Sequence, residues 1–99
     1  MENCIDYTQQ AELLKALAHP VRLHIVHALL KDGCRNVRCI ETEISASQSN
    51  ISQHLQRLRS AGIVSAERCG NEVYYRVTSL KTARLLAALT KEEEVSYAI

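Results

Sequence analysis

Residues 47–77 read SQSNISQHLQRLRSAGIVSAERCGNEVYYRV, and this stretch decides the fold of the chain. Three apolar residues of its first part stand at i, i+4 and i+7, on one face of an α-helix. They are Ile51, Leu55 and Leu58. Ser47 is a residue type that caps helix N-termini, and Gly62 is one that ends helices. The sequence therefore predicts a helix between these two residues, with its apolar face turned into a core.

A β-hairpin is predicted directly after this helix. Residues 64–69 and 72–77 form two short runs, and apolar and polar side chains alternate in the second run, as in a half-buried strand. Gly70 and Asn71 separate the runs and suit a two-residue hairpin turn.

Helical spacing of apolar residues predicts four further helices, three before the quoted stretch and one after it. They are expected from about Thr8 to Ala18, from Pro20 to a stop at Gly33, from an N-cap at Asn36 through Ile44, and from about Ser79 onward. The resulting order is helix, helix, helix, helix, strand, strand, helix. We therefore expect residues 1–99 to form a single winged helix-turn-helix domain, mainly α with a β-hairpin wing.

Length and composition limit the possible functions. A chain of 99 residues holds one domain with little interior for a closed substrate pocket, and Cys39 with a histidine is the only nucleophile and base that could be considered. We therefore expect no enzyme. No apolar stretch approaches the ~20 residues of a membrane span, and the first residues are acidic where a signal peptide carries lysines. A cytoplasmic location with reduced thiols is expected.

The start of the central helix is suited to reading DNA. Glutamine and asparagine amides match adenine edges in the major groove, and serine hydroxyls suit phosphate oxygens. No Asp or Glu occurs from Ile44 through Ala66, so a polyanion meets no repulsion there. The residues expected to contact double-stranded DNA are Gln48, Ser49, Asn50, Ser52, Gln53, His54, Arg57 and Arg59 on the helix, with Arg68 and Asn71 on the hairpin.

A plainer interpretation is available from the same residues. Most polar helix faces are only solvated, and a charged hairpin is usually only a hairpin. The same winged fold could also serve as a protein-interaction module without DNA.

Three motifs in the correct order resemble the ArsR/SmtB family of metal- and stress-responsive transcriptional repressors. They are LKALAHPVRL at 14–23, SQSNISQHLQRLRSAGIV at 47–64 and VYYRV at 73–77, and the likeness covers roughly residues 10–90. The resemblance implies a homodimer built from the first and last helices. It also implies a palindromic operator that the dimer leaves when an inducer binds. Within the first motif, His19 is interpreted as structural.

The metal sites common in the family are not matched by this sequence. The resemblance places a Cys-x-Cys pair of the third helix on Asn36 and Arg38, and neither is a soft ligand. The other common site needs a histidine on the last helix, and residues 79–99 contain none. His24, His27 and His54 are interpreted as packing or polar helix residues rather than as a metal cluster.

Two cysteines nevertheless flank those positions. With Asn36 as N-cap, Cys39 is at N3, where the helix dipole and nearby Arg35 and Arg38 would favour its thiolate. Together with Cys34, it could bind a soft ion or be oxidised to a disulfide or polysulfide bridge.

The inducer is predicted to be a soft metal or metalloid such as As(III) or Cd(II), with redox or reactive-sulfur sensing as the alternative. We expect no cofactor other than such an ion at cysteine thiolates, with Cys4 as a possible third ligand. Cys69 is interpreted as incidental, and each cysteine could instead be a small buried hydrophobe.

Overall fold

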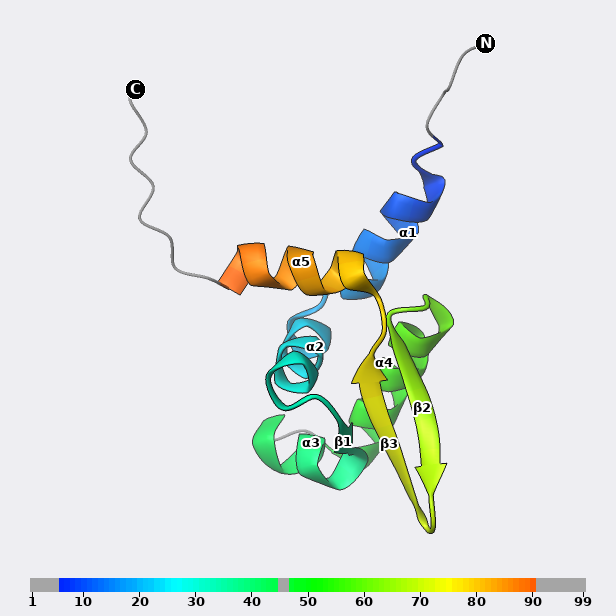
Figure 1. Cartoon of the computed structure of the whole chain (residues 1–99), viewed down its shortest axis with the longest axis vertical. Coiled ribbons are helices and arrows are strands. Elements are labelled where there is room, and N and C mark those ends of the chain that lie inside the picture. The colour runs from blue at the N-terminus through cyan, green and yellow to red at the C-terminus, as the bar shows by residue number, and fades with distance from the viewer. Residues whose placement is uncertain (1–5, 45–46, 91–99) are drawn as a thin grey trace.

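The structure is a computed structural model that describes residues 6–44 and 47–90, and within them five helices and three strands follow one another (Figure 1). α1 spans Thr8–Leu17, α2 Pro20–Asp32, β1 Arg35–Asn36, α3 Val37–Ile44, α4 Gln48–Ser60, β2 Val64–Cys69, β3 Glu72–Val77 and α5 Leu80–Thr90. This order confirms the predicted winged helix-turn-helix. None of the helices in these two ranges has the length and apolar character needed to cross a membrane.

Helix ends lie where the local sequence predicts them. The Ser47 hydroxyl accepts a hydrogen bond from the backbone N–H of Asn50 (3.2 Å), which caps α4. Gly33 follows α2 with φ of 88°, and Gly62 stands just beyond α4 with φ of 77°. Both conformations are left-handed and favour glycine, so each helix stops where its sequence allows the chain to turn.

The sheet contains a strand that the sequence did not predict. β1 pairs antiparallel with β3, and β2 pairs with the other edge of β3, which gives the strand order β1-β3-β2. A two-residue strand is too short to show an alternating pattern, and its pairing depends on where α2 delivers the chain. The expected hairpin is therefore the larger part of a three-stranded sheet.

The core forms where the helices meet the base of the hairpin. The predicted inward residues of α4, Ile51, Leu55 and Leu58, are fully buried, together with Ile25 and Leu29 of α2. Burying a side chain of this kind contributes about 1.5–3 kcal/mol. The core therefore fixes which face of α4 points outward.

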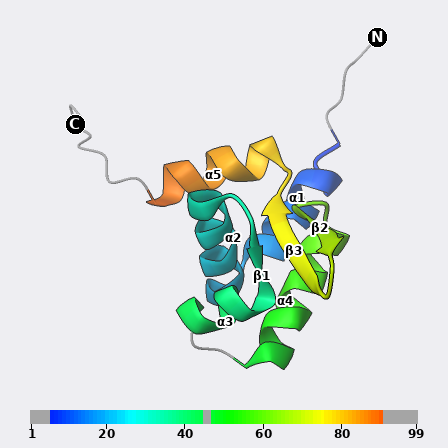
Figure 2. The same cartoon turned by 60° about the horizontal axis from the view of Figure 1, so that its bottom comes forward.

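The arrangement places two different surfaces at opposite ends of the molecule. α1 and α5 lie at one end, and the turn between β2 and β3 lies at the other (Figure 1). In both views the hairpin runs alongside α4 (Figures 1 and 2). The start of α4 and the turn of the hairpin thus lie at the end that is remote from α5.

Candidate nucleic-acid interface

The first half of α4 exposes polar side chains to solvent. Because the core takes up one face of the helix, the opposite face carries small hydroxyls and amides. The exposed residues of this half are Ser49, Asn50, Ser52 and Gln53, and the side chain of Gln48 lies outside the part of the chain that the structure describes. Further along, Gln56 and Arg59 are also exposed. α4 contains no carboxylate, so this face suits a polyanion.

The hairpin adds cationic and amide groups beside α4. Arg68 on β2, Asn71 in the turn and Arg76 on β3 are all exposed. Gly70 adopts φ of 65°, a left-handed conformation that the tight turn needs. The predicted wing residues Arg68 and Asn71, together with Arg76, thus project from the hairpin that runs along the polar helix.

His54 differs from its neighbours because its ring packs against α2. The ring centroid lies 4.4 Å from that of His19, at an interplanar angle of 49°. His19 is itself the N-cap of α2, and its Nδ1 accepts the backbone N–H of Val21 at 3.1 Å, which supports its interpretation as structural. Burial, and then the charges of His19 and Arg22, lower the pKa of His54. This half-buried ring therefore joins α4 to the start of α2.

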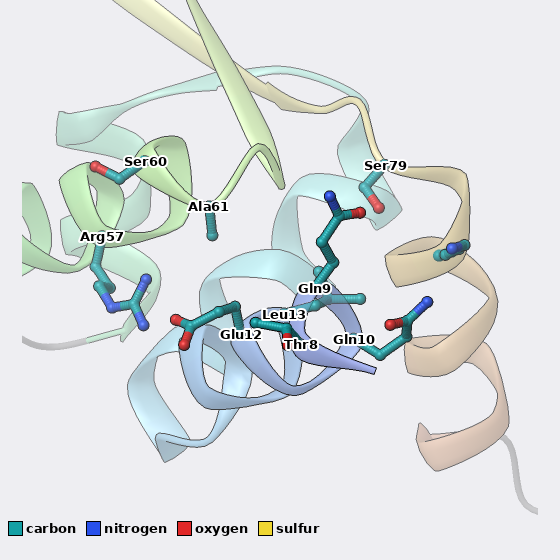
Figure 3. Close-up of a pocket in the computed structure, with 10 residues that line it drawn as sticks. Thr8, Gln9, Gln10, Glu12, Leu13, Arg57, Ser60, Ala61 and Ser79 are labelled. Atoms are coloured by element: carbon teal, nitrogen blue, oxygen red, sulfur yellow. The ribbon is translucent and has the colours of Figure 1, made fainter. Parts of the chain in front are cut away.

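Arg57 also points away from the exposed polar face. Its side chain lines a pocket between α1, the end of α4 and the start of α5, and Glu12 of α1 points into the same space (Figure 3). Arg57 is half-buried, whereas Arg59 is exposed. Both arginines of α4 were predicted to contact DNA, and of the two only Arg59 is exposed to solvent. Both contacts remain predictions.

Cys34 and Cys39 lie together on the surface. Both are exposed, and both line a shallow hollow with Asn36, Thr42 and Tyr74. Their exposure argues against the alternative that they are buried hydrophobes. Cys69 is exposed as well, whereas Cys4 lies outside the described residues. Among residues 6–44 and 47–90, no group of three or more His, Cys, Asp or Glu side chains could hold a metal ion.

The surroundings of Cys39 agree in part with the sequence. The side-chain Oδ1 of Asn36 accepts the backbone N–H of Cys39 at 2.9 Å, so Asn36 is the N-cap and Cys39 is at N3, as predicted. Arg35, however, is held by Asp32 and Glu43. The hydrogen bond to Glu43 is the main cause that raises the pKa of Arg35. The charge of Arg35 is thus compensated by carboxylates and is not free to favour a thiolate.

Comparison with known proteins decides the family. The sequence profile described as "Bacterial regulatory protein, arsR family" matches residues 19–66. The biofilm growth-associated repressor of Xylella fastidiosa (strain Temecula1) is 43% identical to this chain over 79 residues, which make up 80% of this chain and 68% of that repressor. The chain belongs to the ArsR family.

Solved structures of similar sequence agree with the ArsR assignment. The transcriptional repressor PagR of Bacillus anthracis superimposes with a TM-score of 0.78 at 38% identity, covering 83% of this chain and 93% of PagR. A homodimeric winged helix-turn-helix DNA-binding domain from Mycobacterium bovis gives a TM-score of 0.76 at 36% identity, covering 90% and 86% of the two chains. This ArsR-family chain is therefore a winged-helix transcriptional repressor and not an enzyme.

The ArsR assignment also explains what local sequence could not reveal. His19 and His54 are far apart in the sequence, and only the fold shows that they touch. In the sequence, each histidine was marked only by its place in one of two separate family motifs. Similarly, the exposure of Cys34 and Cys39 in one hollow depends on β1, which has no periodic signal.

Proposed function

We propose that this ArsR-family repressor binds a palindromic operator as a homodimer, with α4 of each protomer in a major groove. The observation that carries the proposal is the exposed, carboxylate-free polar face of α4. Recognition helices contact bases with their N-terminal residues, which is where the hydroxyls and amides lie.

Specific groups are assigned to two kinds of contact. Asn50 and Gln53 would read base edges, and Ser49 and Ser52 would bind bases or phosphates. Three exposed groups would neutralise or hydrogen-bond the phosphate backbone: Arg59, Arg68 and Asn71. We assign His54 and Arg57 to the positioning of α4 against α2 and α1, because their side chains point that way.

A second copy of the chain would cover the end of the molecule that is remote from the wing. Large apolar side chains on and beside α1 and α5 are more than half exposed: Tyr7 67%, Leu14 54%, Leu80 65% and Leu89 66%. Apolar surface of this kind favours association. The homodimeric Mycobacterium bovis domain supports the formation of a dimer.

The inducer is proposed to act on the thiols of Cys34 and Cys39. Two exposed sulfurs lining one hollow offer soft ligands to As(III) or Cd(II). Cys4 could supply a third thiolate. The alternative is oxidation, in which the two thiols give two protons and two electrons to a peroxide, which leaves as water, as a disulfide forms. With a polysulfide, one zero-valent sulfur atom enters the bridge between the two cysteine sulfurs, and a second takes up the two protons and two electrons and leaves as hydrogen sulfide.

The test measures the affinity of the full chain for DNA of its own promoter region by fluorescence anisotropy. The reduced protein is compared with protein exposed to As(III), Cd(II), Zn(II), peroxide or polysulfide. We expect one of these to weaken binding at least about fivefold, within the usual range of allosteric coupling.

Single-cysteine variants locate the response. Cys34→Ser and Cys39→Ser should each abolish it, whereas Cys69→Ser, an exposed cysteine on the wing, is the matched control and should retain it. A full response in both sensor variants would show that these two thiols do not sense the inducer. The proposal that the chain binds DNA would still stand.

A further inference from the structure

Asn36 lies between the two cysteines and uses both ends of its side-chain amide. Oδ1 accepts a hydrogen bond from the backbone N–H of Cys39 (2.9 Å), and Nδ2 donates to the carboxylate of Glu72, the first residue of β3. The first bond caps α3, and the second ties the same residue to the wing. A side-chain amide carries its acceptor and its donors on two separate atoms, so it can bind both partners at once.

The backbone around Asn36 is fixed as well. β1 pairs antiparallel with β3, with Asn36 opposite Tyr74. Arg35 binds Asp32 at the end of α2 and Glu43 near the end of α3. These ion pairs hold residues 32–43 together. Asn36 connects this segment to β3 through both its backbone pairing and its side-chain hydrogen bond.

The thiols of Cys34 and Cys39 stand on either side of this joint. Cys34 directly precedes β1, and Cys39 is in the first turn of α3. A bridge between the two sulfurs, by a bound ion or by a disulfide, closes a short loop that contains Asn36. Because Asn36 lies between the two cysteines, any rearrangement of that loop on bridging acts directly on the backbone and side chain of Asn36.

Building on the thiol response proposed above, we propose that Asn36 is the positioning residue that transmits a change at Cys34 and Cys39 to the wing. In the reduced protein its amide holds Glu72 and the start of α3 in the arrangement that binds DNA. Bridging the thiols withdraws the amide from these partners, so the wing loses its fixed position relative to α3. The reduced and the bridged states then differ in DNA affinity, and such a difference is needed for an inducer to release the protein from DNA.

The experiment uses the full chain with Cys69→Ser, which removes the wing thiol and keeps Cys4, the possible third ligand. The DNA probe is a labelled duplex selected from random sequences by this reduced protein. Two reagents bridge the thiols: arsenite, which binds them, and diamide, which takes up their two protons and two electrons as the disulfide forms. Mass spectrometry identifies the bridged species, and the Kd for the duplex is measured before and after treatment.

Variants of the amide and its wing partner test the coupling. We expect at least one reagent to weaken DNA binding of the parent about tenfold or more. Asn36→Asp keeps the cap acceptor but loses the donor, and Glu72→Ala loses the wing acceptor. Both should bind DNA more weakly when reduced and respond less than about threefold to bridging. Glu72→Gln keeps an acceptor and should restore the response, which a merely structural role would not predict.

The matched control is Glu67→Ala, which removes an exposed glutamate from β2 and should respond like the parent. If the parent responds and the Glu72→Ala protein responds to the same extent, the proposed role of Asn36 is wrong, whereas the thiol response stands. A parent whose Kd is unchanged by both reagents would overturn the thiol response and the coupling together. DNA binding by the reduced protein would stand in either case.

Discussion

His54 shows how a single residue of α4 can link the stability of the fold to pH. Its ring lies against His19, and Arg22 acts on the same group from α2. Burial and the charges of His19 and Arg22 all lower the pKa of His54 below the ordinary value of 6.5. The neutral ring is thus the form that fits between α4 and α2.

The free energy of unfolding should therefore fall as the pH is lowered through about 6.5. In that range the unfolded chain binds a proton at His54 that the folded chain does not, so protons favour unfolding. Urea denaturation at pH values above and below this point measures the effect. His54→Gln should reduce the pH dependence, whereas His27→Gln, which changes an exposed histidine of α2, should leave it unchanged. Equal pH dependence in parent and His54→Gln would contradict the linkage.

Single residues also show where sequence reasoning succeeds. Asn36 and Ser47 could be assigned as caps because a cap interacts with a backbone N–H only three residues further on. The contacts of His54 and Arg57 could not be predicted, because they depend on α2 and α1 packing against α4. Both side chains point toward those helices rather than into the exposed polar face.

At the scale of elements, α4 and the wing have different tasks in the proposed complex. α4 carries amides and hydroxyls that distinguish bases, and the wing carries charges that neutralise phosphates. These two contributions can be separated by salt, because the number of counterions released depends on how many phosphates the protein neutralises.

Arg68→Ala should weaken DNA binding for every sequence and lower the salt slope by about 0.9 for each phosphate that the protein no longer neutralises. Gln53→Ala should instead relax sequence preference and leave the slope unchanged. Anisotropy titrations at several salt concentrations measure both quantities. Lys31→Ala removes an exposed charge in the last turn of α2 and serves as the control. An unchanged slope in Arg68→Ala would remove this wing residue from the interface.

The helices and strands that could be predicted are those whose sequence pattern is local to the element itself. The two hairpin strands match the sequence prediction residue for residue, because alternation and a glycine turn define them. β1 was missed, since a two-residue strand exists only through its pairing with β3. The same strand brings Cys34, Asn36 and Cys39 next to the wing, so the sequence alone could suggest a thiol pair but not its route to the DNA-binding surface.

At the scale of the whole molecule, DNA binding and dimerisation are proposed at opposite ends. The hairpin turn lies at one end, and α1 and α5 lie at the other (Figure 1). With a second copy at the α1 and α5 end, both α4 helices remain free to enter successive grooves of one duplex. This separation is what allows two weak half-site contacts to act as one strong site.

Charges placed on the apolar end should therefore abolish the dimer without unfolding the protomer. Leu80 and Leu89 are 65% and 66% exposed on α5, so Leu80→Glu combined with Leu89→Glu removes little from the core of a single chain. We expect a folded monomer by sedimentation and circular dichroism. Its affinity for a two-half-site operator should be lower by on the order of 100-fold, because the linkage between half-sites is absent.

Thr42→Glu introduces a single carboxylate on the exposed side of α3 and should remain dimeric. The monomeric variant should bind a single half-site about as well as the parent does, since α4 and the wing are unaltered. A double variant that stays dimeric would show that the apolar residues of α5 do not form the dimer interface. A monomer with full operator affinity would show that one protomer alone reads the whole site.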